Sequence, residues 1–214
     1  LSHIDRNQRN IVTVEDPVEY DLDGIGQVHV NTKTGLTFAS GLRSILRQDP
    51  DVVLVGEIRD LETAEIAIQA SLTGHLVLST LHTNTAIGAI TRLQDMGVDS
   101  YLIASSLSGI MAQRLVRVLC NNCKKAEPAT DKEKHILGLA DEEDITLYHP
   151  AGCSECNQSG FRNRIGIFEL IVIDGEIKTM IHNGVDEQSL LKAIRKNSPS
   201  ILDNGLQRVR DGIT

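Results

Sequence analysis

Aromatic residues are scarce in this sequence of 214 residues, and tryptophan is absent. Phe, Trp and Tyr together make up 3 % of the chain, so a hydrophobic core must rely on Leu, Ile, Val and Ala. Proteins that bind single-stranded nucleic acid stack bases on aromatic rings, and this chain offers few of them. The composition therefore argues against a nucleic-acid binder.

Long hydrophobic runs are missing as well. No stretch approaches the roughly 18 consecutive apolar residues that a membrane-spanning helix needs. The first residues, LSHIDRNQRN, lack the charged-then-apolar pattern of a signal peptide. They also lack an initiator Met, so we expect Leu1 to be the edge of a fragment. A cytoplasmic location is the expectation from these features.

Positive charge is in the minority. The chain has 21 Lys and Arg against 29 Asp and Glu, which gives a formal net charge of -8. An acidic balance opposes adhesion to nucleic acid or to anionic lipid. The apolar fraction of 41 % is ordinary for a globular protein, and the length suffices for one large domain or two small ones.

Cysteine occurs only four times, in the pairs CNNC and CSEC, which residues 124–152 separate. Two CxxC turns can each present two thiolates, and four thiolates close a tetrahedral zinc site that leaves no position open for chemistry. We therefore predict a structural zinc ion; the alternatives are four reduced thiols or two disulfides. The expected ligands are Cys120, Cys123, Cys153 and Cys156.

Strand-like and helix-like segments alternate up to Leu119, which is typical of an α/β protein with a mostly parallel sheet. The expected buried strands are Ile11–Val14, Val52–Val55 and Leu76–Leu78, with a short hairpin within residues 20–35. The expected helices are the tail Leu1–Asp5, residues 38–48 after a Thr37 cap, and residues 61–74, 85–96 and 101–118. Beyond them we expect a polar insert with one helix near 131–139, a strand or hairpin element at 164–173, and two or three amphipathic helices between 175 and 212.

Acidic and histidine clusters follow the expected strands, where an α/β sheet places its chemistry. Glu15, Asp16 and Glu19 follow the first strand, Glu57 follows the second, and His75 and His82 flank the third. An acid after an apolar strand can bind Mg²⁺ or polarise the water that attacks a γ-phosphate. The alternatives are solvated loop carboxylates and a histidine satisfied in the core, although Thr80, Thr83 and Asn84 make the surroundings of His82 polar.

Three arginines lie near these clusters in the sequence. Arg43 and Arg47 are four positions apart and share one helix face, while Arg59 follows Glu57 by two positions. Cationic groups beside a phosphate offset the charge that develops during phosphoryl transfer. A phosphate-facing role and an ordinary surface role are both open for these side chains.

Four long motifs resemble the ATPase family of type II secretion and type IV pilus assembly. They are TVEDPVEY, LRQDPDVVLVGEIRDLETAEIA, TGHLVLSTLHTNTA, and AQRLVRVLC with the two CxxC pairs. The resemblance covers nearly all of the chain. Within the family, DGIGQVHVN and SLTGHLVLSTLHTNTAIGAITRLQDMGVD are most similar to the type II secretion branch, with the pilus assembly branch as its near neighbour.

The resemblance implies a RecA-like α/β fold with a mostly parallel sheet and helices on both faces, a zinc-bearing insert and a C-terminal helical segment. It also implies a homo-hexamer that hydrolyses Mg²⁺-ATP to power protein export, peripheral on the inner membrane and bound to platform and anchoring proteins. By this likeness Glu57 is the catalytic carboxylate, and Glu15 and Asp16 order Mg²⁺ and water. His82 senses the γ-phosphate, and the three arginines face phosphate or a neighbouring subunit.

One departure from the family pattern concerns the phosphate-binding loop. No G-x-x-x-x-G-K-[ST] occurs in residues 1–214, and the family places it shortly before the strand Ile11–Val14. We therefore expect an incomplete ATPase core over 1–119, a tetracysteine insert over 120–160 and a C-terminal strand and helical segment over 161–214. We also expect the chain by itself to hydrolyse ATP negligibly. A zinc-stabilised docking module without turnover is the alternative from another functional class.

Overall fold

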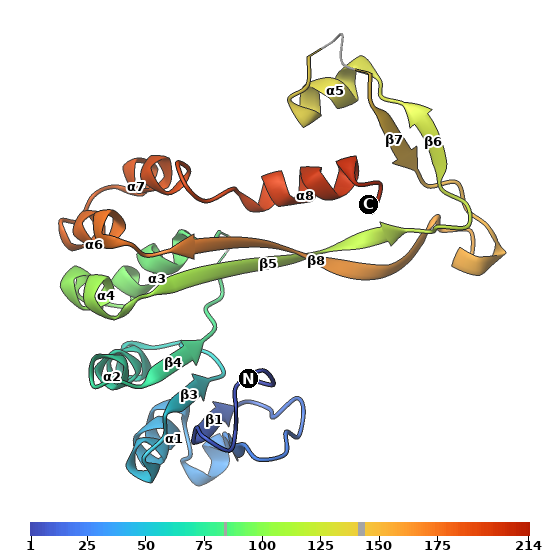
Figure 1. Cartoon of the computed structure of the whole chain (residues 1–214). Coiled ribbons are helices and arrows are strands. Elements are labelled where there is room, and N and C mark those ends of the chain that lie inside the picture. The colour runs from blue at the N-terminus through green and yellow to red at the C-terminus, as the bar shows by residue number, and fades with distance from the viewer. Residues whose placement is uncertain (84, 141–143) are drawn as a thin grey trace. The chain divides into compact units, whose positions relative to one another are not determined.

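The computed structural model of the chain describes residues 1–83, 85–140 and 144–214 (Figure 1). Asn84 therefore lies outside the described residues. Two compact units emerge: residues 1–110 with 172–193 form unit 1, and residues 111–171 with 194–214 form unit 2. These boundaries differ from the segments expected from the sequence, because each of two long strands contributes residues to both units.

Unit 1 contains a parallel sheet of four strands in the order β2-β1-β3-β4. Its strands are β1 (Ile11–Glu15), β2 (Gly26–His29), β3 (Val52–Val55) and β4 (Leu76–Ser79). The β-branched runs of β1 and β3 are buried in the middle of the sheet, as strands of a parallel sheet usually are. The expected fold class, α/β with a parallel sheet, is confirmed.

Two expectations about strands in unit 1 are wrong. Strand β4 is not buried, because it lies at the end of the described sheet, and the side chain of Leu76 is left 51 % exposed. The hairpin expected in residues 20–35 is absent among the described residues, because β2 pairs in parallel with β1 instead. Only a single antiparallel bridge, between Asn31 and Leu36, occurs there.

Helices α1 (Phe38–Ile45) and α2 (Leu61–Leu72) pack against the sheet and against each other. Thr37 begins α1 with a capping box shared with Ser40, and a short 3-10 turn, Leu46–Gln48, follows the helix. The apolar face of α1 joins Val12, Val14, Val53 and Val55 in one core cluster. Gly41 allows close contact, since a Cβ atom there would lie 3.0 Å from Val14 Cγ1.

Further along unit 1 come α3 (Gly88–Asp95), α4 (Ser100–Ser106) and α6 (Gly175–His182). The helix expected over 101–118 is wrong, because its larger part is β5 (Gly109–Leu119). In β5 the side chains alternate between the two faces of a ribbon that it forms with β8 (Phe161–Val172). The helix tail expected at Leu1–Asp5 is also wrong, since those residues contain turns and a bend.

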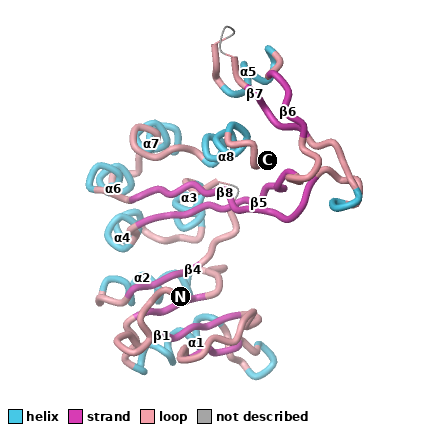
Figure 2. The backbone as a smooth tube through the Cα atoms, turned by 45° about the vertical axis from the view of Figure 1, so that its right-hand side comes forward, coloured by secondary structure: helices cyan, strands magenta, loops and turns pink. Residues whose placement is uncertain are grey.

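Strands β5 and β8 run antiparallel. The amide of Ile173, after β8, donates to Ser108 before β5, and the amide of Cys120, after β5, donates to Gly160 before β8. Figure 2 shows both strands as long magenta segments. The strand predicted at residues 164–173 is thus confirmed, and so are the amphipathic helices after it: α6, α7 (Glu187–Ile194) and α8 (Ile201–Arg210).

Unit 2 contains a small antiparallel sheet of β6 (Lys125–Pro128) and β7 (Thr146–His149), and helix α5 (Asp131–Leu137). The helix predicted near residues 131–139 is confirmed. The segment after α8 binds this region: Lys124 Nζ donates to Gly212 O at 2.8 Å, and Leu119 N donates to Ile213 O at 2.8 Å.

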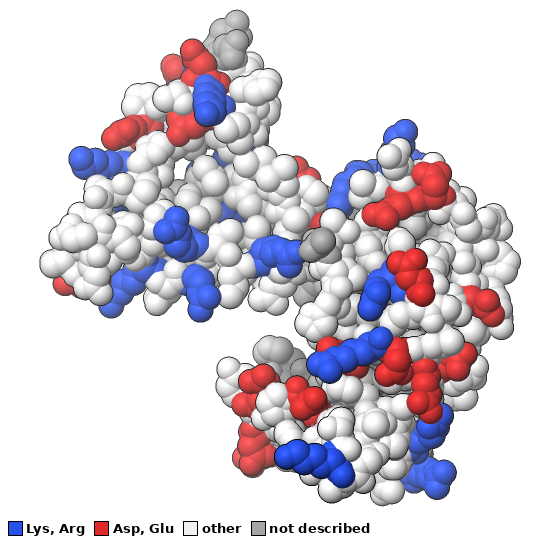
Figure 3. All heavy atoms as spheres, turned by 180° about the vertical axis from the view of Figure 1, so that it is seen from behind, with Lys and Arg blue, Asp and Glu red and all other residues white. Residues whose placement is uncertain are grey.

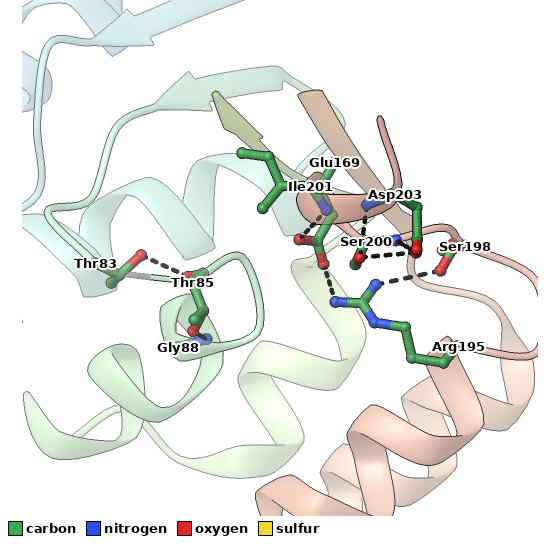
Figure 4. Close-up of polar contacts among 9 residues, drawn as sticks. All are labelled: Thr83, Thr85, Gly88, Glu169, Arg195, Ser198, Ser200, Ile201 and Asp203. Carbon is green, nitrogen blue, oxygen red and sulfur yellow. Dashed lines mark hydrogen bonds and ion pairs between the residues drawn. The ribbon is translucent and has the colours of Figure 1, made fainter. Parts of the chain in front are cut away.

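A buried carboxylate links β8 to the start of α8 in unit 2 (Figure 4). Glu169 is 5 % exposed; its Oε1 pairs with Arg195 Nη2 at 2.5 Å and its Oε2 accepts from Ile201 N at 3.3 Å. Ser200 caps α8 in a capping box with Asp203. The Glu169 carboxylate therefore provides the counterion of Arg195, and it also accepts a hydrogen bond from the Ile201 amide, which has no partner within the first turn of α8.

The surface carries both signs of charge. On the face in Figure 3, Asp and Glu (red) lie interspersed with Lys and Arg (blue). Within the described residues, no helix has the length and apolar character required to traverse a lipid bilayer.

Candidate functional site at the carboxyl edge of the sheet

The parallel register brings the polar ends of three strands to one edge of the sheet. Val14 of β1 is paired with Val55 of β3, and Val55 is paired with Ser79 of β4. The next residues of each strand therefore leave the sheet side by side, as expected for ligand sites in open α/β sheets. This edge carries Glu15, Asp16, Glu57, Thr80 and His82.

Glu57 is the most buried acid at this edge. Its side chain is 11 % exposed, Oε1 forms an ion pair with Arg59 Nη2, and Oε2 lies 3.0 Å from His82 Nε2. Gly56 allows this placement, because a Cβ atom there would lie 3.2 Å from the carbonyl oxygen of Val14. The structure thus unites three of the residues singled out from the sequence.

The charge of Glu57 is set by its partners. The Arg59 guanidinium lowers the pKa of the Glu57 carboxyl against the opposing effect of burial, and His82 adds to the lowering. In return Glu57 raises the pKa of Arg59, and the negative charge of nearby Asp16 contributes to that rise. The site therefore holds an ionised carboxylate that can accept a proton or a hydrogen bond.

Thr80 connects the segments that carry Glu57 and His82. Its Oγ1 donates to Gly56 O at 2.6 Å, and its carbonyl accepts from Ile58 N at 3.1 Å. These bonds extend the pairing of β3 and β4 past the last ladder residue. From the sequence Thr80 was only a polar neighbour of His82, since nothing local indicates a bond across 24 positions.

Glu15 lies at the end of β1 and is held by two neutral donors. Its Oε1 accepts from Thr13 Oγ1 at 2.6 Å and from Gln27 Nε2 at 3.0 Å. Thr13 is fully buried. Sequence reasoning missed both donors. A threonine two positions before an acid is the only local signal that points to the first of them.

Within the described part of the chain, neither Arg43 nor Arg47 pairs with Glu57. Arg43 pairs with Glu62 of α2 at 2.7 Å. Arg47 lies at the opposite edge of the sheet, because the adjacent Gln48 carbonyl accepts from Asn10 just before β1. Their predicted roles toward phosphate or a neighbouring subunit stay predictions.

The sequence predicted that His75 lies with His82 at the carboxyl end of a strand, and for His75 this prediction is wrong. It precedes β4 and so lies at the amino edge of the sheet, where its Nδ1 is 2.9 Å from Ala70 O. The reason is the direction of the strand: only residues after β4 reach the edge that carries Glu57.

The four cysteines form one cluster in unit 2. Their sulfurs all lie within 4.8 Å of one another, with 3.9 Å between Cys120 and Cys153 and 3.8 Å between Cys123 and Cys156. Four thiolates at zinc–sulfur distances of about 2.3 Å in a tetrahedron are about 3.8 Å apart. None of the four forms a disulfide. The cluster could therefore hold a zinc ion, as predicted.

Backbone amides surround these sulfurs. Cys123 Sγ accepts from Gly152 N at 3.3 Å, and Cys156 Sγ accepts from Cys153 N and Gly160 N at 3.2 Å each. Burial opposes ionisation of Cys156, but the amides of Cys153 and Gly160 lower its pKa to about 6. Burial raises the pKa of Cys123 to about 11. Such outer-shell donors are typical of structural metal sites.

Comparison with known proteins gives a consistent family. The family described as type II/IV secretion system protein matches residues 1–214. The chain is 56 % identical to the type II secretion system ATPase E of Vibrio cholerae and 57 % identical to the type II secretion system protein E of Pseudomonas aeruginosa, in each case over all 214 residues. It spans only 42 % and 43 % of those two proteins.

Solved structures share the fold. The crystal structure of the pilus retraction motor PilT with bound ADP aligns with a TM-score of 0.68 and 29 % identity, over 96 % of this chain and 50 % of that one. The ATPase DotB of Legionella pneumophila aligns with a TM-score of 0.66 and 23 % identity, over 96 % of this chain and 48 % of that one. The DotB likeness concerns the fold alone.

Proposed function

Because the chain belongs to the family of type II/IV secretion system proteins, we propose that it is the catalytic part of an ATPase that powers protein export by type II secretion. The relative from Vibrio cholerae, named a type II secretion system ATPase, supports this proposal at 56 % identity. The observation that carries it is the ionised Glu57 between Arg59 and His82, at the edge where such sheets bind ligands.

In this proposal Glu57 polarises the water that attacks the γ-phosphate of ATP. Its lowered pKa keeps it ionised at neutral pH, so it is ready to accept a hydrogen bond from that water. His82 has an exposed ring and is the group that contacts the γ-phosphate region. Arg59 holds the carboxylate, and with Arg43 and Arg47 it offsets phosphate charge, in part across a subunit boundary.

Mg²⁺ would be held on the side of β1. Glu15 and Asp16 supply carboxylate oxygens, the ligands that Mg²⁺ prefers. The ion would neutralise phosphate charge during transfer. The four-cysteine cluster would hold a structural Zn²⁺ ion without a part in the chemistry, since four thiolates fill its coordination sphere.

For the whole protein we propose a homo-hexamer on the cytoplasmic face of the inner membrane, bound to the secretion platform and anchoring proteins. Nucleotide-dependent domain rotation would perform the mechanical work. Type II secretion is preferred over pilus assembly because the relatives at 56 % and 57 % identity are named type II secretion system proteins.

The decisive experiment is ATP hydrolysis by the full-length protein with Glu57→Gln. We expect kcat to fall by at least about a hundredfold, the usual cost of removing one group that stabilises the transition state. Glu65→Gln, on the exposed face of α2, is the matched control and should keep full activity. Wild-type turnover in Glu57→Gln would sink the proposal and favour a docking module without hydrolysis.

Residues 1–214 alone should hydrolyse ATP negligibly. They contain no G-x-x-x-x-G-K-[ST], so the β- and γ-phosphates lack their usual amide cradle and lysine. Phosphate release by the purified chain, compared with its Glu57→Gln variant, measures this. Robust turnover that depends on Glu57 would contradict the expectation.

A further inference from the structure

Both donors of the Gln27 side-chain amide, on β2, and its oxygen acceptor have hydrogen-bond partners. Nε2 donates to Glu15 Oε1 and to Tyr20 O, at 3.0 Å each, and Oε1 accepts from Leu22 N at 2.7 Å. An amide offers two donors and one oxygen acceptor, so this arrangement has a single orientation. With the amide reversed, its oxygen would face the oxygens of Glu15 and Tyr20, and its NH₂ group would face an amide hydrogen.

The pairing of β1 and β2 explains how one side chain reaches all three groups. Thr13 is paired with Gln27 and Glu15 with His29, so these four side chains share one face of the two strands. His29 Nδ1 also accepts from Val18 N, at 3.4 Å. Strand β2 itself contributes no fully buried residue. Its side chains instead hold the backbone of the loop after Glu15.

The contacts of Glu15 are unevenly divided between its two oxygens. Oε1 accepts from both Thr13 and Gln27. Among the residues that the structure describes, none donates to Oε2. A carboxylate held in this way has a fixed rotation, and one oxygen is left for a water molecule or a cation.

The donors to Glu15 are also neutral. Glu57, in contrast, is paired with the charged Arg59. A neutral donor orients a carboxylate without compensating its charge, so the attraction of Glu15 for a cation is preserved. An amide at position 27 meets this requirement, whereas a lysine or arginine there would not.

We propose that Gln27 is a positioning residue that orients the Glu15 carboxylate for Mg²⁺ and water in ATP hydrolysis. The inference rests on the proposed function. It assigns to β2 the task of fixing the acidic loop at the catalytic edge. Gln27 would act only through Glu15, whereas other residues of the site would touch the nucleotide or the ion directly.

The test is steady-state ATP hydrolysis by the full-length protein with Gln27→Leu, which removes the three hydrogen bonds at similar side-chain volume. We expect kcat to fall about tenfold, with the KM for ATP within about twofold of wild type, because Gln27 itself would touch neither the nucleotide nor the ion. Gln69→Leu makes the same change on the exposed face of α2 and should leave both constants unchanged. Wild-type kcat in Gln27→Leu would overturn the inference.

A double-mutant cycle distinguishes positioning from a loss of structure. In a Glu15→Gln background, Gln27→Leu should lower kcat by less than about twofold, because the group it positions is already gone. An equal tenfold loss in both backgrounds would overturn the inference. If Gln27→Leu fails to fold, Gln27→Glu serves instead: it keeps the acceptor for Leu22 N, removes the donor and places a second negative charge beside Glu15, so a loss of kcat at least as large is expected.

The cycle also separates the two proposals. If Glu57→Gln and Glu15→Gln strongly lower kcat while Gln27→Leu does not change it, the ATPase function stands and the role of Gln27 falls. If Glu15→Gln retains full kcat, the role given to Glu15 falls together with this inference. If the wild-type full-length protein shows no turnover dependent on Glu57, the proposed function itself fails.

Discussion

At the residue scale, Glu57 is a buried acid whose partners are both exposed. The side chains of Arg59 and His82 are 62 % and 86 % exposed, against 11 % for Glu57. Solvent and salt therefore screen the partners, while the acid bears the cost of burial. Such an arrangement leaves the two exposed partners room to move while the buried carboxylate stays in place.

The ion pair predicts a specific pH dependence of stability. Because the folded pKa of Glu57 lies below the ordinary 4.5, its ionisation stabilises the folded chain above pH 4.5. That contribution is lost as the pH falls through the lowered pKa. Urea unfolding of residues 1–214 should therefore show Glu57→Gln less stable than wild type at pH 7, with the difference shrinking as the pH falls below about 4.5.

The control is Glu65→Gln, whose acid is exposed on α2 and should give little difference at either pH. A difference for Glu57→Gln that stays constant between pH 7 and the acid limb would contradict the electrostatic account. It would indicate that packing, and not charge, distinguishes the variant.

Whether a site residue could be predicted depends on how its contacts arise from the sequence. Glu57, Arg59 and His82 follow successive strands, so a parallel sheet alone brings them together. Gln27 was missed because its bond to Glu15 spans 12 positions and depends on β2 pairing in parallel. The expectation that Arg43 and Arg47 share one helix face is wrong, because Arg43 lies in α1 and Arg47 lies in the 3-10 turn that follows it.

At the element scale, β5 shows where periodicity misleads. The run YLIASSLSGIMAQRLVRV is rich in apolar residues, which suggested a single helix. The structure ends α4 at Ser106 and begins β5 at Gly109, where pairing with β8 satisfies the backbone. Long-range pairing of this kind has no local signature, so tertiary contacts override the helical pattern.

The Glu169–Arg195 pair provides a test of the connection between β8 and the segment that joins α7 to α8 (Figure 4). Glu169→Gln should lower the free energy of unfolding by about 1–3 kcal/mol, because Arg195 keeps its charge in a partly buried place without a counterion. Glu155→Gln breaks an exposed pair with Arg162 and should cost no more than about 1 kcal/mol.

Urea unfolding at neutral pH measures both variants. Equal costs for Glu169→Gln and Glu155→Gln would show that burial adds nothing to the pair in β8.

At the scale of the whole molecule, the two units should differ in their dependence on metal. Unit 1 has an aliphatic core, whereas the polar region around β6 and β7 relies on the four thiols. The purified chain should contain one zinc ion. Removing it with a chelator should increase amide hydrogen exchange in residues 120–128 and 146–160 and leave β1 and β3 protected.

Metal analysis and hydrogen-exchange mass spectrometry together check this expectation. Cys156→Ser should reproduce the effect of the chelator, while Ser159→Ala, which loses only hydroxyl contacts in the same turn, should retain the metal. Increased exchange throughout β1 and β3 after metal removal would contradict the independence of the two units.

The bond between Lys124 and Gly212 has a consequence for synthesis of the protein. The two residues are 88 positions apart, so the ribosome makes Cys120 and Cys123 long before it makes the C-terminal segment that bonds to Lys124. At about 5–20 residues per second, the delay is roughly 4 to 18 seconds. During that time the thiols of the nascent chain lack the contact with the C-terminal segment. Early binding of a metal ion would protect them from oxidation.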